Sequence, residues 1–309
     1  MSREPYYRSY STYLRERFGE RVYRVCLDAG LGCPNRDGKL GVSGCVFCSD
    51  RGSWGERGHG SPLEEQLRRE KERVRKRYGV NRFIAYFQAF SNTYAPPHVL
   101  KKIYDSVLSN DEEIVGLAIG TRPDCIDSSI LGVISSYHPR KQVWIEYGLQ
   151  SAHDRTLELV GRGHDVQAFT DAVLQTNEYG IGVFAHIIIG LPGEGRQENI
   201  ETAEYLAGLP IEGVKIHNLN IIRGTELETW YDEGRATPLA LEEYAERVVD
   251  FLERTKPEVA VARLSTDTPP DRLVEPKWSL NKNAVAARIR DEFARRGSCQ
   301  GLLCPEPMM

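Results

Sequence analysis

The feature that most constrains the fold is an alternation of two patterns along the first three quarters of the chain. Short runs rich in β-branched and aromatic residues alternate with longer stretches that have helical periodicity and charge. Strands separated by helices form βαβ units and a parallel sheet. The expected strands are 21–27, 82–90, 113–120, 142–150, 182–191 and 213–222, and the expected helices between them are 62–78, 97–109, 127–137, 165–179 and 196–207.

Such a repeat allows two architectures, an open doubly wound sheet or a curved (β/α) barrel. Residues with reactive side chains stand just after several different strands, which is where the loops of a barrel place them. We therefore expect an α/β fold, a partial (β/α)6 TIM-type barrel with a small C-terminal extension. The expected parts are a basic N-terminal arm over 1–20, the barrel over 21–235 and the extension over 236–309, with a helix at 239–255, a short strand at 258–264 and a last helix at 281–296.

Composition excludes a membrane-embedded chain. Of the 309 residues 27% are charged, the mean hydropathy is −0.44, and no apolar run is long enough to span a bilayer. The first residues, MSREPYYRSY, lack the apolar core of a secretory signal. We expect a cytoplasmic protein with no membrane partner.

Charge is distributed unevenly between the two parts of the chain. Residues 1–82 contain 18 Lys+Arg and 11 Asp+Glu, whereas the remainder contains 22 and 33. A basic front half on an acidic protein indicates a polyanionic partner such as nucleic acid. The ordinary interpretation, a solvated helix rich in arginine, is the one that charge alone favours.

Clustered cysteines are the most informative motif. Cys33, Cys45 and Cys48 form C-x11-C-x2-C directly after the first strand, on a loop rich in glycine. Three thiolates can bind three corners of a cubane iron–sulfur cluster and leave the fourth iron open to a small molecule. A zinc site is the alternative, with Cys26 or His59 as a fourth ligand. A redox dithiol would have no use for Cys33, so spacing leaves the cluster and zinc both open.

The resemblance to a known family extends beyond this loop. Cys33-x11-Cys45-Val-Phe-Cys48 resembles the cluster loop of radical S-adenosylmethionine (SAM) enzymes, and its long first gap resembles the branch of the elongator catalytic subunit. Together with this loop, five further motifs resemble the YhcC/YtqA-like family over nearly the whole chain. They are YFQAFSNTYAP (86–96), TRPD (121–124), EYGLQSAHDRTLELVGRGHD (146–165), HIIIGLPGE (186–194) and GVKIHNLNIIRGTELETWY (213–231).

This resemblance implies the cofactors and their chemistry. Cys33, Cys45 and Cys48 would hold a [4Fe-4S] cluster whose fourth iron binds SAM. One electron, from a donor such as ferredoxin or flavodoxin, would cleave SAM and release a 5′-deoxyadenosyl radical. Cys125, Cys299 and Cys304 match no second cluster motif, and we interpret them as inert thiols.

Residues of the fourth strand are the strongest candidates for the SAM site. Glu146, Gly148 and Gln150 are spaced two apart, so they share one face, and polar side chains facing a barrel interior are costly unless something bonds them. The resemblance places SAM there, with Glu146 near its ribose or methionine and Gly148 giving clearance. Arg162 resembles the arginine that holds the SAM carboxylate, although an exposed helix-end arginine is the alternative.

Other cofactor contacts are expected on neighbouring loops. The run Gln-Ala-Phe at 88–90 departs from the Gly-Gly-Glu type motif that binds the SAM amino group, so backbone carbonyls or Asn92 would take that role. Phe47 is expected beside the adenine, or else is a core aromatic residue, and Gly190 belongs to a run that resembles the loop backing the adenine. The candidates from these loops are Phe47, Gln88, Asn92, Thr93 and Gly190.

The expected catalytic residues are Glu146, Gln150, His186 and Lys215, on or just after the fourth, fifth and sixth strands. His186 stands in an apolar run, where a histidine is usually a satisfied core residue. Arg122, Asp124 and His217 are further candidates for substrate contact or proton handling.

We expect a tRNA substrate, at the C5 substituent of the wobble uridine, because the related branch acts on that base. The segment 67–82 has eight Lys/Arg against two Glu, and 6–19 interleaves Tyr with Arg, so the two could track phosphates and stack on bases. Two alternatives remain: the same chemistry on a small metabolite, and a non-catalytic RNA-binding module stabilised by zinc.

Overall fold

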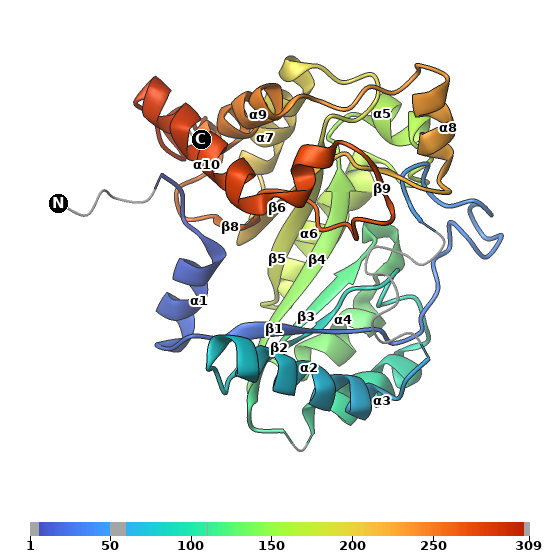
Figure 1. Cartoon of the computed structure of the whole chain (residues 1–309). Helices are drawn as coiled ribbons and strands as arrows, with labels where there is room; N and C mark the ends of the chain where they lie inside the picture. The colour runs from blue at the N-terminus through green and yellow to red at the C-terminus, as the bar shows by residue number, and fades with distance from the viewer. Residues whose placement is uncertain (1–5, 50–59, 110, 306–309) are drawn as a thin grey trace.

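The computed structural model describes residues 6–49, 60–109 and 111–305. Seven parallel strands form one curled sheet in the order β1-β2-β3-β4-β5-β6-β8, with helices on its convex face (Figure 1). The strands are β1 (Tyr23–Leu27), β2 (Phe83–Phe87), β3 (Ile114–Thr121), β4 (Gln142–Gln150), β5 (Gly182–Ile189), β6 (Gly213–Asn218) and β8 (Ala260–Arg263). The helices that alternate with them are α2 (Leu63–Tyr78), α3 (Pro97–Leu108), α4 (Ser128–Ser135), α6 (Val166–Glu178), α7 (Arg196–Ala207) and α9 (Leu241–Glu253).

This arrangement confirms the partial barrel and adds a seventh strand. The sequence assigned the strand at 258–264 to the C-terminal extension, but β8 pairs in parallel with β6, Gly213 opposite Ala260. Helix α9 connects the two strands as the crossover of one more βαβ unit. The remaining elements are α1 (Tyr10–Phe18), α5 (Asp154–Leu159), α8 (Glu226–Asp232), α10 (Lys282–Arg296), the 3-10 turns Pro123–Cys125 and Lys277–Leu280, and an antiparallel pair, β7 (Ile221–Ile222) with β9 (Leu273–Glu275).

Alternation along the strands separates the two faces of the sheet. On β4, Val143, Ile145, Tyr147 and Leu149 belong to the large core between the sheet and the outer helices, whereas Trp144 belongs to a separate cluster on the concave face. The period of two that predicted a shared face for the even-numbered residues of this strand is therefore present in the packing.

The N-terminal segment closes the lower part of the concave face. Ser9 begins α1 by accepting a hydrogen bond from the Thr12 amide, and it pairs with Val261 of β8. The Tyr13 ring lies against Trp144 and Phe184 near the starts of β4 and β5. This part of the expected basic arm is thus built into the barrel, and its Tyr13 ring is not free to stack on bases.

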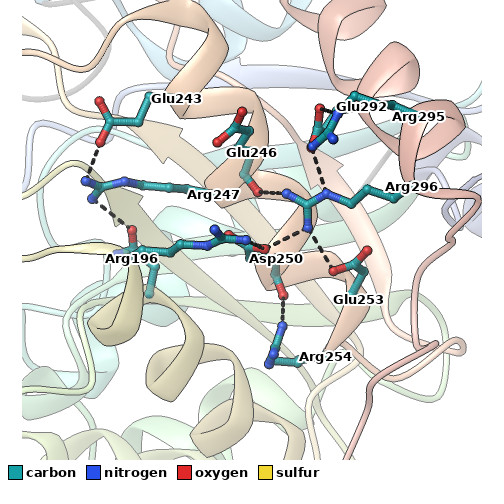
Figure 2. A network of polar contacts seen from close by, with 11 residues as sticks. Arg196, Glu243, Glu246, Arg247, Asp250, Glu253, Arg254, Glu292, Arg295 and Arg296 are labelled. Atoms are coloured by element: carbon teal, nitrogen blue, oxygen red, sulfur yellow. Dashed lines mark hydrogen bonds and ion pairs between the residues drawn. The ribbon is translucent and has the colours of Figure 1, made fainter.

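A network of arginines and carboxylates holds the C-terminal helix on the outside of the barrel (Figure 2). Arg296 of α10 contacts Asp250 at 2.7 Å and Glu253 at 3.0 Å, both on α9, and its Nε donates to Glu292 at 2.7 Å. Arg196 of α7 reaches the other oxygen of Asp250 at 2.6 Å. Three helices are therefore joined by charge-assisted hydrogen bonds.

The described ends of the chain meet beside this network. Gln300 accepts a hydrogen bond from the Arg8 amide at 2.8 Å, and its own amide donates to the Tyr6 carbonyl at 2.8 Å. Within the described residues, no helix combines the length and the apolar character needed to cross a bilayer.

Candidate functional site

The cysteine loop follows β1 and lies at the edge of the sheet where the parallel strands end. All three thiols are free, Cys45 being buried and Cys33 and Cys48 partly exposed. The Cys48 amide donates to the Cys45 carbonyl at 2.9 Å, which closes a tight turn between these two cysteines. The Val46 amide donates to the Val160 carbonyl at 3.1 Å, so the loop is anchored to the segment that follows β4.

The chemistry of Cys45 fits a group that binds thiolates. The Cys48 thiol, followed by the guanidinium groups of Arg162 and Arg122, holds the pKa of Cys45 well below its ordinary value, although burial acts in the opposite direction. The thiolate form is the one that binds metals. The hydrogen bond between the two thiols in turn raises the pKa of Cys48. The donor set, three free thiols, is that of the iron–sulfur cluster expected from the sequence, although the described side chains are not gathered into a metal-holding group.

The zinc alternative needs a fourth ligand, for which the sequence suggested Cys26 or His59. Among residues 6–49, 60–109 and 111–305, no three Cys, His, Asp or Glu side chains form a group that could hold a metal ion, and this holds for Cys33, Cys45 and Cys48 as well as for a zinc site. Cys26 lies on β1 with its thiol directed at the Gln88 side chain, 3.6 Å away. The other suggested ligand, His59, lies outside the described residues.

Arg162 joins the cysteine loop to β4. It lies between Gly161 and Gly163, whose φ angles of 63° and 73° turn the chain sharply. Its Nη1 donates to the Cys45 sulfur at 3.6 Å and its Nη2 to the Gly148 carbonyl at 2.8 Å. The buried Nε has no hydrogen-bond partner among the described residues, and is therefore the position on this side chain from which a ligand could be held.

The upper part of β4 is shaped for close approach. A side chain on Gly148 would lie 2.5 Å from both Arg162 Nη2 and Gln150 Nε2, so it would displace the ends of these two side chains. Gln150 itself has a φ of 76°, a conformation that is costly for a residue with a side chain and is concentrated at functional sites. The structure thus brings Gly148, Gln150 and Arg162 together as the sequence predicted.

Glu146 lies deeper in the barrel and is held by hydrogen-bond donors from three other strands. Its two oxygens contact Arg24 of β1 at 2.5 Å, His186 of β5 at 2.8 Å and Lys215 of β6 at 3.2 Å. The sequence indicated that a buried carboxylate here needs a partner, and the protein itself supplies it. A contact between Glu146 and SAM stays a prediction.

Burial controls protonation in this cluster. It lowers the pKa of Lys215 to about 7 and that of His186 to about 4, and nearby cations act in the same direction. Burial also opposes ionisation of Glu146, but Arg24, Lys215 and His186 hold its pKa well below the ordinary value. The carboxylate is therefore charged, while Lys215 can gain or lose a proton near neutral pH.

Sequence reasoning missed two members of the cluster. Arg24 bonds Glu146 and donates through Nε to the Tyr10 hydroxyl at 2.8 Å, and Tyr86 of β2 accepts a hydrogen bond from Lys215 at 2.7 Å. A signal for Arg24 was present, because it interrupts an otherwise apolar strand core. His217 was named, and its Nε2 is buried with no hydrogen-bond partner among the described residues, beside the His186 ring at 5.3 Å.

The end of β2 supplies one unoccupied acceptor. Phe90 has a φ of 57°, and the amide of Asn92 donates to the carbonyls of Ala89 and Gly120, both at 2.9 Å. Asn92 Oδ1 is buried with no partner in the described parts of the chain. Thr93, by contrast, is bonded to the Thr121 hydroxyl at 2.6 Å.

Phe47 and Gly190 lie on either side of a small apolar cluster above the barrel. Phe47 packs against that cluster, which includes Val160 and Leu191. Gly190 has a φ of 97°, and a side chain there would approach Leu239 to 3.2 Å. The role of both residues beside an adenine stays a prediction.

Comparison with known proteins gives matches over the whole chain. Residues 30–206 match the model of the radical SAM superfamily, and residues 211–295 match that of the radical SAM C-terminal domain. YtqA of Bacillus subtilis is 40% identical over 96% of this chain and 92% of its own length. YhcC of Escherichia coli is 35% identical over 96% of this chain and 94% of its own length.

Two further similarities are partial. A tRNA uridine(34) acetyltransferase of Dehalococcoides mccartyi is 32% identical over 50% of this chain and 34% of its own length. The structure of Elp3 from the archaeon Methanocaldococcus infernus superposes with a TM-score of 0.67 and 18% identity, over 90% of this chain and 64% of that one. The second similarity concerns the fold alone.

Proposed function

The chain belongs to the radical SAM superfamily and, within it, to the YhcC/YtqA-like family, and from this premise we propose that it is an enzyme that modifies tRNA. Its cofactors are a [4Fe-4S] cluster and SAM, as in the rest of the superfamily. The reaction needs a one-electron donor, for which we propose ferredoxin or flavodoxin. When bound, the cofactors supply a 5′-deoxyadenosyl radical that removes a hydrogen atom from the substrate.

Residues of this chain would hold the two cofactors in the following way. Cys33, Cys45 and Cys48 would bind three of the four irons. The free Oδ1 of Asn92 is an acceptor suited to the SAM ammonium, and the free Nε of Arg162 is a donor suited to its carboxylate. Gly148, which has no side chain, lets the ends of the Arg162 and Gln150 side chains approach the β4 backbone.

Below this site, the buried cluster around Glu146 is suited to handling protons. Lys215 changes its charge near pH 7, and His186 hydrogen-bonds the same carboxylate oxygen as Lys215. A group whose pKa lies near the working pH, as that of Lys215 does, exchanges protons readily with a substrate, whereas His186, with a pKa of about 4, is neutral at pH 7 and acts as an acceptor. We assign Lys215 and His186 to proton transfer, with Gln150 at the rim as a substrate contact.

The observation that favours tRNA is the similarity to a tRNA uridine(34) acetyltransferase, which covers half of this chain. The proposed reaction is hydrogen abstraction from an aminomethyl-type substituent at C5 of the wobble uridine, followed by trimming or rearrangement. The basic helix α2 supports an RNA partner, since Lys76 and Arg77 are exposed near its end. Arg73 and Arg75, in contrast, are paired with Glu70 and Glu113 at 2.7 Å.

One observation favours the second candidate, a small metabolite. The basic end of α2 leads directly into the start of β2, so it lies at the end of the barrel opposite to the cysteine loop (Figure 1). A helix of 16 residues is about 24 Å long. An RNA that contacts both Arg77 and the cluster would have to extend along the whole barrel.

The deciding experiment compares modified nucleosides of tRNA by mass spectrometry in a parent strain and a deletion strain. We expect one C5-substituted uridine to be replaced by its precursor in the deletion, and to return with the intact gene but not with Cys45→Ala. An unchanged nucleoside profile would support a small metabolite as the substrate instead. Anaerobically purified protein should be brown with about four irons per chain, which a zinc-stabilised module would not be.

A binding measurement tests the RNA surface separately. Changing Lys76 and Arg77 to Gln should weaken tRNA binding and lower the slope of log affinity against log salt by about 0.7–0.9 per lost phosphate contact. The matched pair, Arg73→Gln with Arg75→Gln, should change the slope less, because both arginines already have carboxylate partners. Equal affinity and slope in both double variants would make α2 an ordinary solvated helix.

A further inference from the structure

The sulfur of Cys45 is approached by two N–H donors that the proposed function does not require. Arg162 Nη1 lies 3.6 Å from it and Asn35 Nδ2 lies 3.7 Å from it. Asn35 comes from the cysteine loop, whereas Arg162 follows α5, so the two donors reach the same sulfur from different segments. Donors to a ligand sulfur are one of the ways in which a protein sets the reduction potential of an iron–sulfur cluster.

Both donors are fixed by contacts of their own. Asn35 Nδ2 also donates to the Gly161 carbonyl at 2.7 Å, and a side chain on Gly41 would lie 2.8 Å from Asn35 Oδ1. Arg162 is fixed at its other terminal nitrogen by the Gly148 carbonyl at 2.8 Å. The donors therefore keep their direction without help from a bound ligand.

A third residue, Arg122, holds the backbone of Arg162. Arg122 Nη1 donates to the Arg162 carbonyl at 2.8 Å, and its Nε and Nη2 donate to the two oxygens of Asp124, each at 2.8 Å. The bidentate pair orients the Arg122 side chain. Arg162 is thus held at its backbone and at its side chain.

The surroundings strengthen the effect of these donors. Cys45 is 4% exposed, Asn35 5% and Arg162 7%. Hydrogen bonds and charges act more strongly in such an interior than in water. A buried positive charge and two N–H dipoles stabilise the more negative, reduced state of a cluster bound at Cys45.

We propose that Arg162 and Asn35 are positioning residues that raise the reduction potential of the cluster through Cys45, and so bring it within reach of its electron donor. This inference rests on the proposed function, because it needs Cys45 to be a cluster ligand. The redox step is the uptake of one electron by the oxidised cluster from the donor. No bond to Arg162 or Asn35 is formed or broken.

The test is a redox titration of the reconstituted full-length protein without SAM, followed by the electron paramagnetic resonance signal of the reduced cluster. In Arg162→Gln, the ratio of reduced to oxidised cluster at a fixed solution potential should fall about tenfold, which is about 59 mV for one electron. Asn35→Leu, which removes a neutral donor of similar shape, should lower the ratio about threefold, half of that shift on the logarithmic scale.

Arg36→Gln is the matched control. Arg36 carries the same charge on the same loop, but its guanidinium donates to the carbonyls of Cys48 and Ser49 at 2.9 and 2.8 Å and not to a sulfur. In Arg36→Gln, the ratio of reduced to oxidised cluster should stay within about twofold of that in the wild type. An equal fall in Arg36→Gln would show that charge alone matters, and an unchanged ratio in Asn35→Leu and Arg162→Gln, each with full iron content, would overturn the proposal.

Two further outcomes separate this inference from the assignments on which it rests. If the wild-type protein assembles no cluster, the proposed function is wrong, and the inference about the reduction potential falls with it. If Arg162 serves only to hold SAM, Arg162→Gln will lose SAM affinity while its SAM-free potential equals that of the wild type. Should Arg162→Gln lose iron, Asn35→Leu and Arg162→Lys decide, the latter keeping the charge but losing the planar donor pair.

Discussion

Two ionic networks occupy opposite sides of the sheet, and they differ in how their charges meet water. Inside the barrel, the side chains of Glu146 and Lys215 are 0% and 4% exposed, and that of Arg24 is 14% exposed. On the outside, Glu292 is equally buried, but its partner Arg295 is 63% exposed, and Figure 2 shows several arginines meeting the carboxylates of α9 and α10.

The two networks differ in which charged partner has a strongly shifted pKa. Hydrogen bonds from Arg295 and Arg296 lower the pKa of Glu292 to about 2, so this pair keeps both charges. In the barrel, burial lowers the pKa of Lys215 to about 7. In the outer network, Arg295 and Arg196 are 63% and 60% exposed and lose little hydration, although Arg296, at 15%, is almost as buried as Arg24. In the inner network both members of the pair Glu146–Lys215 are buried, and their desolvation costs more than apolar packing would. The inner network is therefore the one to which we assign chemistry.

The largest expected effect tests whether the inner side is the reactive one. Replacing Cys33, Cys45 or Cys48 with Ala should abolish SAM cleavage, because each would remove one of three proposed cluster ligands. Replacing Cys26, Cys125, Cys299 or Cys304 with Ala should leave the iron in place, as measured by iron content and 5′-deoxyadenosine formation. Loss of the cluster in Cys26→Ala alone would contradict the open-iron arrangement.

A smaller effect separates the two networks by ligand affinity. Glu146→Ala or Arg162→Ala should weaken SAM binding about ten- to a hundredfold, since a lost charge-assisted contact costs about 1.5–3 kcal/mol. Glu292→Ala, on the outside, should leave the affinity unchanged. Isothermal titration on reconstituted protein measures all three, and unchanged affinity in both inner variants would remove them from the SAM site.

The outer network should respond in stability and not in chemistry. Arg296→Gln removes charge-assisted bonds to Asp250, Glu253 and Glu292, so urea denaturation should show a loss of about 1.5–3 kcal/mol. Arg295→Gln, which removes an exposed partner, should cost about 1 kcal/mol or less. A fall in SAM cleavage per folded molecule in either variant would break the distinction between the networks.

The last effect is a pH dependence that belongs to the inner network only. Lys215 has an ordinary pKa of 10.5 and one of about 7 in the folded protein, so between these values the unfolded chain binds more protons. The free energy of unfolding should therefore rise with pH, by at most about 1.4 kcal/mol per unit for one proton. Below about pH 7 this contribution no longer changes, because Lys215 is protonated in both states.

Lys215→Met should flatten that rise when urea denaturation is compared at pH 7.5 and 9. Glu292→Gln is the control, because the folded pKa of Glu292, about 2, lies below its ordinary 4.5. Its contribution to stability is complete above about pH 4.5 and is lost only on acidification. Equal slopes for the wild type and Lys215→Met would show that Lys215 keeps its charge in the barrel.

The sequence predicted what depends on local pattern. The alternation of strands and helices gave the partial barrel. The period of two along 142–150 correctly placed Glu146 on the face opposite to Ile145 and Tyr147, although the pairing shifts register between Gly148 and Gln150. The strand at 260–263 was expected as well, but not its place in the sheet. Four residues carry no information about which edge they pair with.

Local patterns could not predict contacts between residues that are far apart in the sequence. The donors that hold Glu146 come from strands 40 to 122 residues away, and no spacing rule connects them. The two donors to Cys45 depend on the turn around Arg162, which glycines on both sides produce. The N-terminal tyrosines looked like a base-stacking surface, because a sequence does not show that Tyr13 is covered by Trp144.

The hydrogen bonds between Gln300 and the backbone of Tyr6 and Arg8 also bear on whether the chain can be circularly permuted. Since residues 6–8 touch residue 300, a linker between these two segments could be short, and the chain could be opened instead in the exposed turn at 138–140. The order of the strands in space would be unchanged while their order in synthesis was rotated. The arrangement of the barrel in space is therefore independent of where along it the chain is opened.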